Sequence, residues 1–478
     1  MPASAPCPVN RATWRGLFLG TPQTRASLFL MLGAVALTVF FQEYRDWDLV
    51  AAVPDSDSYI QGNTAASWRP PVYPLFIRCL ADPDALLAER RQMPLNGTVD
   101  GAAFPLALRV VRGQKVVLAA SLLFFVWGLG RFLPLPFGLV SGVLAATMLS
   151  PERGTILSEA FAQAATFCTA ASFLAFMTGP RARWLVCASL MAAVGFLIRP
   201  ACIYLYALPG VMVAWYAYAF RKKALALIMA CAALSLLLAL APALLRYAQR
   251  GVFLVEPHQA ASPMTFALYF AEAADIPFLP DEQSRTFLST ALEKRQSLLA
   301  ELPPPQTPSD MSTIFDRMLY DIVFPLSSTL GYDVYTEKRL FKEIYPVVFE
   351  RHFREIVRYR ICAFHDALVM STRQNQVISP LSGRIIDLPR GVCAYTFLLA
   401  IVVLCCLERS RYALIPLGLE LMHLVHILVT VVYNVPTLRY IALTNVFSLA
   451  AFLISLFMIG KILATRLPSV CRAAKSGS

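Results

Sequence analysis

Long apolar runs alternate with short charged stretches along most of this chain. Several of the runs approach the roughly 20 residues that a helix needs to cross the hydrocarbon core of a bilayer. The pattern predicts an all-α polytopic membrane protein with about ten transmembrane helices. We place them at Ala26–Phe41, Val116–Leu133, Leu135–Leu149, Ala160–Met177, Trp184–Ile198, Ala201–Phe220, Ala224–Leu245, Val392–Leu407, Leu414–Tyr433 and Tyr440–Ile459.

Composition agrees with this fold class. Of the 478 residues, 57% are hydrophobic and only 15% are charged, whereas soluble domains carry about 25% charged residues. The mean hydropathy is +0.58. Aromatic residues make up 12% of the chain, which suits both interfacial belts and a lipid-binding groove. A soluble enzyme is therefore excluded.

The net charge of +12 is distributed unevenly between the two sides of the predicted bundle. When the connections are assigned alternately to two sides, one side has fifteen basic residues and a single acid, Glu408. The positive-inside rule makes that side cytosolic, so both tails, 1–25 and 461–478, face the cytosol. The excess charge is thus a topology signal and does not indicate a nucleic-acid partner.

This topology divides the chain into regions. A membrane bundle covers residues 26–245 and contains a large outer loop, 42–115. A second outer region follows at 246–391, and the C-terminal transmembrane helices occupy 392–460. The compact, Ala-rich sequence is typical of a bacterial inner (plasma) membrane protein.

The second outer region carries helix-like patterns. They predict helices at Phe266–Ala274 and Glu282–Ala300, and one amphipathic helix within 340–370 that lies on the membrane surface. Its apolar positions include Phe341, Val348 and Ile356. We therefore expect extracytoplasmic interfacial helices packed over the bundle.

Charged residues gather at the outer ends of the predicted spans. Asp55 and Asp57 follow the first span, Glu159 opens the fourth, Arg199 joins the fifth to the sixth, and Arg439 precedes the last. All lie at one depth, near the lipid headgroups. Both arginines are on the outer side, against the positive-inside trend, and a guanidinium suits a phosphate because its planar fork donates two bonds.

Simpler interpretations stay open at these positions. The aspartates could be solvated loop residues, and Ser158-Glu159 fits an ordinary helix start. The two arginines could extend to the interface without binding anything.

A separate polar set lies inside the ninth span. Glu420, His423 and His426 are spaced by three residues and so share a helix face. Ionisable groups within a bilayer are costly and often functional. They could bind a metal, relay protons or simply join helices.

The outer motifs resemble a known family. Asp55-Ser56-x-x-Tyr59, followed by Arg69-Pro70-Pro71-x-Tyr73-Pro74-Leu75-Phe76, is similar to the first outer loop of bacterial GT-C membrane glycosyltransferases related to glycosyltransferase family 39. Leu157-Ser158-Glu159, Ile198-Arg199-Pro200 and Leu438-Arg439-Tyr440 resemble further motifs in the same order. Ser56 stands where protein O-mannosyltransferases have Glu, and no Trp-Trp-Asp-Tyr-Gly motif is present, which disfavours a protein acceptor.

The resemblance implies a GT-C-like fold and a set of roles. Asp55 would be the general base, with Asp57 or Glu159 as a second acid. Arg199 and Arg439 would bind the donor phosphate. The substrate would be positioned by Tyr59, Arg69, Tyr73 and Tyr440.

The implied donor is a sugar on polyprenyl phosphate, held among membrane lipids, and the acceptor is a lipid, a cell-envelope glycan or a protein. One direct displacement would invert the anomeric centre. No cofactor is required, although Mg²⁺ or Mn²⁺ could bind Asp55, Asp57 or Glu159 because these ions prefer oxygen ligands.

Two other classes compete with a transferase. A transporter or flippase would use the Glu420, His423 and His426 face as its coupling site, although such proteins usually contain paired repeats, and none is visible here. An accessory membrane subunit would leave the acidic motif at Asp55 unexplained.

Overall fold

The computed structural model describes most of the chain. The described residues are 25–44, 46–64, 67–68, 70–94, 97–147, 149, 154–220, 222–250, 261–305, 311–369, 377–378, 385–386, 396, 398–403, 411–433 and 438–476. Most of these residues are helical. Short antiparallel strand pairs join β1 (Leu49–Ala51) to β4 (Thr98–Asp100), β2 (Asn63–Thr64) to β3 (Ser67–Trp68), and β5 (Val377–Ile378) to β6 (Ile385–Ile386).

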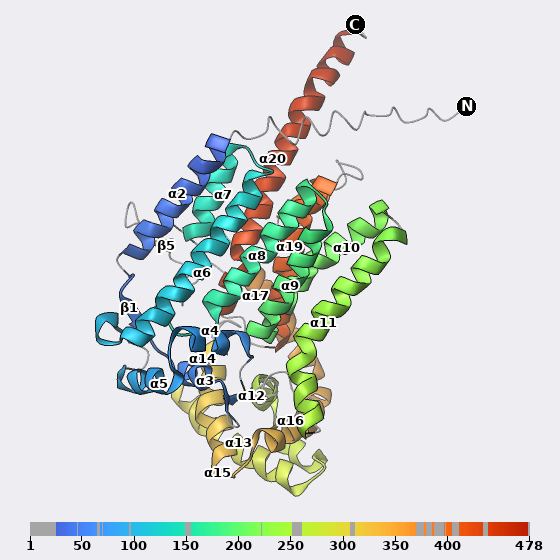
Figure 1. Cartoon of the computed structure of the whole chain (residues 1–478). Coiled ribbons are helices and arrows are strands. Elements are labelled where there is room, and N and C mark those ends of the chain that lie inside the picture. Colours follow the sequence, from blue (N-terminus) through green and yellow to red (C-terminus); the bar gives the residue numbers. More distant parts are fainter. Residues whose placement is uncertain are drawn as a thin grey trace, which may run out of the picture.

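A bundle of apolar helices forms the body of the molecule (Figure 1). Its helices are α2 (Arg25–Tyr44), α6 (Pro105–Gly130), α7 (Leu135–Thr147), α8 (Glu159–Thr178), α9 (Ala182–Ile198), α10 (Ala207–Phe220), α11 (Lys222–Arg250), α19 (Leu414–Tyr433) and α20 (Leu438–Ser476). Helix α8 packs against α6, α9 and α10 and is buried on nearly every side. Its many alanines permit this close approach.

Within the part of the chain that the structure describes, five helices are long and apolar enough to cross a membrane: Pro105–Gly130, Glu159–Thr178, Pro200–Ala219, Leu414–Val432 and Leu443–Ala464. Shorter apolar helices occur at Ala26–Phe41, Leu135–Thr147, Ala182–Ile198 and Ala230–Leu245. Together they coincide with every predicted span except Val392–Leu407, most of which lies outside the described residues. The chain is thus a mainly helical membrane protein, while ten spans stay a prediction.

The first large loop packs at one end of the bundle, called the loop end below. After β1 it contains α3 (Pro54–Gln61), α4 (Val72–Leu80) and α5 (Pro83–Gln92), and β4 leads through η1 (Gly101–Ala103) into α6. Proline at the first position of α3 and of α5 fits a helix start, because its missing N–H would have no partner there. Tyr59, Ile60 and Tyr73 fill a small core between this loop and residues 156–157.

A helical lobe, residues 261–369, lies at the same end of the bundle as the first loop (Figure 1). It comprises α12 (Ala261–Phe270), η4 (Ala273–Phe278), α13 (Glu282–Glu301), α14 (Met311–Arg317), the π-helical turn η5 (Met318–Val323), α15 (Phe324–Thr329), α16 (Val334–Arg351) and α17 (Phe353–Val369). The prediction of a helix at Glu282–Ala300 is confirmed. The helix predicted at Phe266–Ala274 ends instead at Phe270, and a 3₁₀ helix follows.

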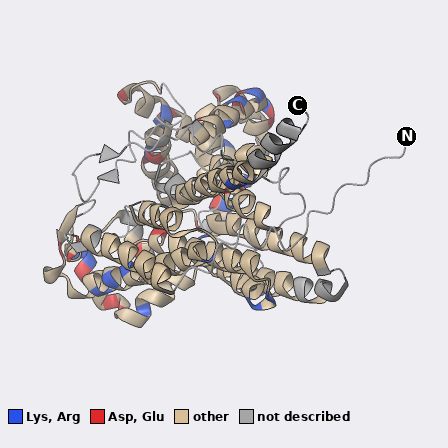
Figure 2. Cartoon of the chain, turned by 90° about the horizontal axis from the view of Figure 1, so that it is seen from above, with Lys and Arg blue, Asp and Glu red and all other residues tan. Residues whose placement is uncertain are grey.

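The prediction of a single surface helix within 340–370 is wrong. The chain breaks at His352 between α16 and α17, and Phe341, Ile344 and Val348 are buried in the core of the lobe. An apolar stripe can be covered by protein as well as by lipid, and sequence does not distinguish the two. Charged side chains are rare in the bundle helices and concentrate in the loop and the lobe (Figure 2).

Candidate functional site

Helix α3 is fastened to the segment that leads into α8. The Ser56 hydroxyl donates to the carbonyl of Ile156 at 3.0 Å, and the Tyr59 hydroxyl lies 2.8 Å from Oγ of Ser158. Residue 51 forms a β-bridge with residue 155. The acidic motif of the first loop and the Ser158-Glu159 motif, about 100 residues apart, therefore form one structure.

Tyr73, in α4, packs against the contact between α3 and the segment that leads into α8. Its buried hydroxyl donates to Oε1 of Gln114 at 2.8 Å, and the amide nitrogen of Gln114 donates to the carbonyl of Thr155 at 2.6 Å. The Tyr73 ring meets the Tyr59 ring edge-on, with centroids 5.3 Å apart. Burial raises the pKa of Tyr73 well above its usual value, and Tyr59 and Glu159 act in the same direction. The phenol therefore stays protonated and acts as a fixed donor.

Glu159 and Arg199 form an ion pair at the loop end of the bundle. Nη1 of Arg199 lies 2.8 Å from Oε1 of Glu159, and the two side chains are 17% and 1% exposed. Glu159 is the first residue of α8, where the helix dipole favours a carboxylate. Arg199 precedes η3 (Pro200–Tyr206), the turn that leads into α10. A guanidinium carries five N–H donors in a planar fork.

Asp57 is held by an arginine that sequence reasoning missed. Nε of Arg90, in α5, lies 3.1 Å from Oδ1 of Asp57, and Arg90 also donates to the carbonyl of Val53 at 3.3 Å. Arg90 is buried while Asp57 is partly exposed. The only sequence signal that Arg90 is buried was its spacing. It comes one turn after the buried Leu86 and so lies on the same helix face. Its neighbour Arg91 is exposed and looks equivalent in sequence.

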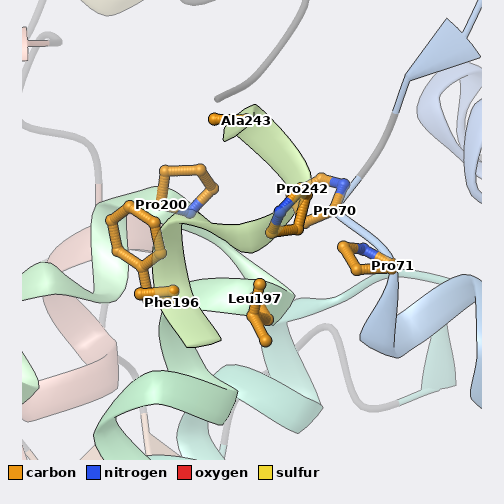
Figure 3. Close-up of a pocket in the computed structure, with 8 residues that line it drawn as sticks. Pro70, Pro71, Phe196, Leu197, Pro200, Pro242 and Ala243 are labelled. Atoms are coloured by element: carbon orange, nitrogen blue, oxygen red, sulfur yellow. The ribbon is translucent and has the colours of Figure 1, made fainter. Parts of the chain in front are cut away.

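An apolar crevice lies at the loop end of α9 (Figure 3). Three segments meet there: the residues before α4, the end of α9 with the start of η3, and the C-terminal half of α11, which contains a proline within the helix. The lining residues are Pro70, Pro71, Phe196, Leu197, Pro200, Ala239, Pro242 and Ala243. Arg199 directly precedes Pro200, a lining residue, although neither Arg199 nor Glu159 itself lines the crevice.

The side chains of four predicted site residues lie outside the described part of the structure. Arg69 lies outside the described residues. The backbone of Asp55 belongs to α3, and those of Arg439 and Tyr440 begin α20, but their side chains lie outside the described part. Among the described side chains, no group of three His, Cys, Asp or Glu could hold a metal ion. The Mg²⁺ or Mn²⁺ site that would include Asp55 stays a prediction.

The polar set in α19 is also buried. Glu420, His423 and His426 are at most 2% exposed. Nδ1 of His423 and Nδ1 of His426 lie 2.9 and 2.6 Å from the same hydroxyl, that of Thr444 in α20. The His426 ring packs against Tyr204 of η3, with centroids 4.2 Å apart. The three residues share one face as predicted, and they contact α20 and η3.

Comparison with known protein families, with curated proteins and with solved structures finds no match for this chain. Inference about function therefore rests on the geometry of two polar centres. One is the junction of α3, α8 and α9 at the loop end, and the other is the buried interface between α19 and α20.

Proposed function

We propose that this protein is a membrane glycosyltransferase that moves a sugar from a polyprenyl-phosphate donor to an acceptor hydroxyl. One observation carries the proposal. The buried Glu159–Arg199 pair includes the residue directly before Pro200, which lines an apolar crevice, and Glu159 directly follows Ser158, which contacts α3, the helix of Asp55. A fixed cation beside an apolar crevice in a membrane protein suits a lipid whose head is a phosphate.

The apolar crevice and the Glu159–Arg199 pair orient the donor. The polyprenyl chain packs on the apolar residues of α9 and α11 around the crevice, where burial of apolar surface stabilises it. The phosphate binds the guanidinium of Arg199, whose position is fixed by Glu159. Glu159 is then a residue that orients Arg199 rather than a second acid. Arg439, at the start of α20, is proposed as the second phosphate ligand.

Asp55 is the proposed general base. It accepts the proton of the acceptor hydroxyl while that oxygen attacks the anomeric carbon. The bond between the anomeric carbon and the phosphate oxygen breaks, and polyprenyl phosphate leaves with the electron pair. The arginines stabilise the charge that develops on the leaving group. One displacement inverts the anomeric centre.

Other residues hold the site in shape. Tyr59 and Tyr73 pack α3 and α4 against the start of α8, so their removal should displace Asp55. Asp57 is held by Arg90 and serves as the alternative base. Arg69 and Tyr440 are proposed to contact the substrate. Mg²⁺ or Mn²⁺ is proposed as an optional partner of the acidic side chains.

The proposed orientation follows the charge distribution. The protein lies in a bacterial inner membrane with both termini in the cytosol and the loop end on the extracytoplasmic face. The first loop and the lobe lie at one end of the bundle, which is compatible with this arrangement (Figure 1). The acceptor is a lipid, a cell-envelope glycan or a protein.

A transporter or flippase is the second candidate. The observation that favours it is the buried Glu420, His423 and His426 face, because ionisable groups at membrane depth are often coupling sites. This candidate predicts lipid or solute movement without cleavage of a sugar phosphate.

The proposal is tested with purified protein in lipid nanodiscs. Polyprenyl-phosphate sugars are supplied with a cell-envelope extract, and free polyprenyl phosphate is measured over time. Wild type should release it, and Asp55→Asn should reduce the rate roughly 100-fold or more, as loss of a general base does. Asp84→Asn, the same change at an exposed acid of α5, should keep the wild-type rate.

Two outcomes would contradict the proposal. Absence of release from every donor by folded wild type would favour the transporter. An Asp55→Asn variant as active as wild type would remove Asp55 from the reaction, and Asp57→Asn would then be measured to test the alternative base.

A further inference from the structure

The hydroxyl of Thr444 lies between two histidine rings in the middle of the bundle. It is 2.9 Å from Nδ1 of His423 and 2.6 Å from Nδ1 of His426, and all three side chains are buried. A hydroxyl has one proton and two lone pairs, so it can donate to one ring and accept from the other. In that arrangement the two imidazoles are opposite tautomers, one carrying its proton on Nδ1 and the other on Nε2.

Glu420 lies on the same face of α19, one turn before His423. It is fully buried, and neither of its oxygens has a hydrogen-bond partner among the described residues. Ser448 of α20 lies near the carboxyl, and its hydroxyl likewise makes no hydrogen bond among the described residues. No described lysine or arginine forms an ion pair with Glu420. An unpaired carboxylate at this depth costs several kcal/mol, whereas the protonated acid is neutral.

The neutral acid and the two histidines form a row. From residue 420 to residue 426 the helix rises about 9 Å, close to a third of the hydrocarbon core. Along this distance the groups on the shared face of α19 and the facing Thr444 can all give or take a proton.

We propose that Glu420, His423, Thr444 and His426 form a proton relay inside the bundle. The carboxyl of Glu420 gives its proton to Nε2 of His423. His423 passes the proton on its Nδ1 to the Thr444 oxygen, and Thr444 passes its own hydroxyl proton to Nδ1 of His426. The products are the Glu420 carboxylate, a neutral His423 of reversed tautomer, an intact hydroxyl and a His426 imidazolium.

The relay ends beside the segment that carries Arg199. The His426 ring contacts Tyr204 of η3, which begins directly after Arg199. The Tyr204 hydroxyl is bonded to Thr166 at 3.0 Å. Arg199 and His426 are close enough to interact through their charges, and Arg360 of α17 reaches α19 at the carbonyl of Val431. A proton on His426 therefore repels Arg199 and links the state of the relay to the Glu159–Arg199 pair.

The first test asks whether Glu420 holds a proton. Infrared spectra of the full chain in nanodiscs at neutral pH, in H₂O and D₂O, should show the C=O stretch of a protonated carboxylic acid. Glu420→Gln should remove this band, and Glu293→Gln, at an exposed acid of α13, should retain it. Identical spectra for wild type and Glu420→Gln would overturn the proposal.

The second test asks whether Thr444 couples the rings. Nitrogen-15 NMR of histidine-labelled protein, assigned with His423→Asn and His426→Asn, should show opposite tautomers in wild type. Thr444→Val should abolish this difference, while Thr169→Val, a buried threonine of α8 that bonds only its own helix, should preserve it. Two rings of the same tautomer in wild type would overturn the relay even if Thr444→Val fails to fold.

Both tests are independent of the proposed transferase, because neither uses a sugar donor. Loss of glycosyl transfer with an intact infrared band and intact tautomers would reject the enzyme and keep the relay. The reverse result would reject the relay and keep the enzyme.

Discussion

Two fully buried glutamates, Glu159 and Glu420, lie in the same bundle in opposite environments. Glu159 begins α8 at the loop end and lies 2.8 Å from Arg199. Glu420 lies within α19, and neither of its carboxyl oxygens has a hydrogen-bond partner among the described residues. The first environment stabilises a carboxylate, and the second stabilises an acid that keeps its proton.

This difference separates two kinds of chemistry. An ionised pair at a helix start can fix a guanidinium in place for an incoming anion. A neutral acid next to two imidazoles can exchange protons but gains little from an anion. The loop end is therefore the part of the molecule suited to a phosphate, and the α19–α20 interface is the part suited to a proton.

The largest expected effect comes from breaking the ion pair. Arg199→Gln leaves Glu159 buried without a cation, which should lower the free energy of unfolding by about 3–5 kcal/mol. Glu420→Gln replaces a neutral acid by an amide of the same shape and should cost less than about 1 kcal/mol. Both are measured by unfolding in mixed micelles with increasing denaturing detergent.

The double variant Arg199→Gln/Glu159→Gln is the control for this comparison. It leaves no uncompensated charge, so it should recover most of the stability lost in Arg199→Gln. Equal losses for Arg199→Gln and Glu420→Gln would show that the two glutamates do not differ in charge, and the comparison would fail.

Sequence predicted the apolar helices well because hydrophobic runs of this length have few alternatives in a membrane protein. It also brought Asp57, Glu159 and Arg199 to one end of the bundle. It could not pair them, because an ion pair depends on the packing of helices far apart in sequence. Arg90 was missed as the partner of Asp57 for the same reason, since Arg90 and Arg91 differ only in which way they face.

The lobe shows where sequence fails for a different reason. Positions such as Phe341 and Val348 form an apolar stripe that suits a membrane surface, yet they are buried in the lobe's own core. The same stripe satisfies both environments. The contact of His423 and His426 with one hydroxyl was equally hidden, because that hydroxyl belongs to Thr444 of another helix.

The second prediction compares the packing of α19, the helix of Glu420, with that of α9, the helix that ends just before Arg199. A Cβ at Gly418 of α19 would lie 2.5 Å from Cζ of the fully buried Phe173, a rigid ring. A Cβ at Gly195 of α9 would lie 2.4 Å from Cδ1 of Leu205, a side-chain end that can rotate away. Gly418→Ala should therefore cost about 2 kcal/mol and Gly195→Ala less than about 1 kcal/mol, measured by detergent unfolding.

Gly210→Ala is the matched control, because nothing lies within 4 Å of a Cβ at that position of α10. It should be neutral or slightly stabilising, as alanine is the better helix former. If Gly418→Ala were as mild as Gly210→Ala, the α8–α19 contact would be looser than the structure shows.

The smallest expected effect concerns a third buried acid, Asp275 of the lobe. Burial alone would raise its pKa, but the backbone N–H of Glu272 at 2.8 Å, Arg351 at 2.5 Å and His352 at 2.9 Å outweigh it and lower the pKa. Like Glu159, Asp275 is therefore a paired carboxylate. We expect it to contribute about 1.5 kcal/mol to the free energy of unfolding at neutral pH.

A lowered pKa fixes the sign of the pH dependence. The contribution of Asp275 is complete above its unfolded pKa of about 3.9 and is lost as the pH falls through its lower folded value. Thermal unfolding of wild type between pH 7 and pH 3 should thus lose stability at the acid end, and Asp275→Asn should flatten that loss. Glu293→Gln, at an exposed acid of the same lobe, should follow wild type. Parallel curves for wild type and Asp275→Asn would mean that the three donors do not hold a charged carboxylate, and Asp275 would then be in the same class as Glu420.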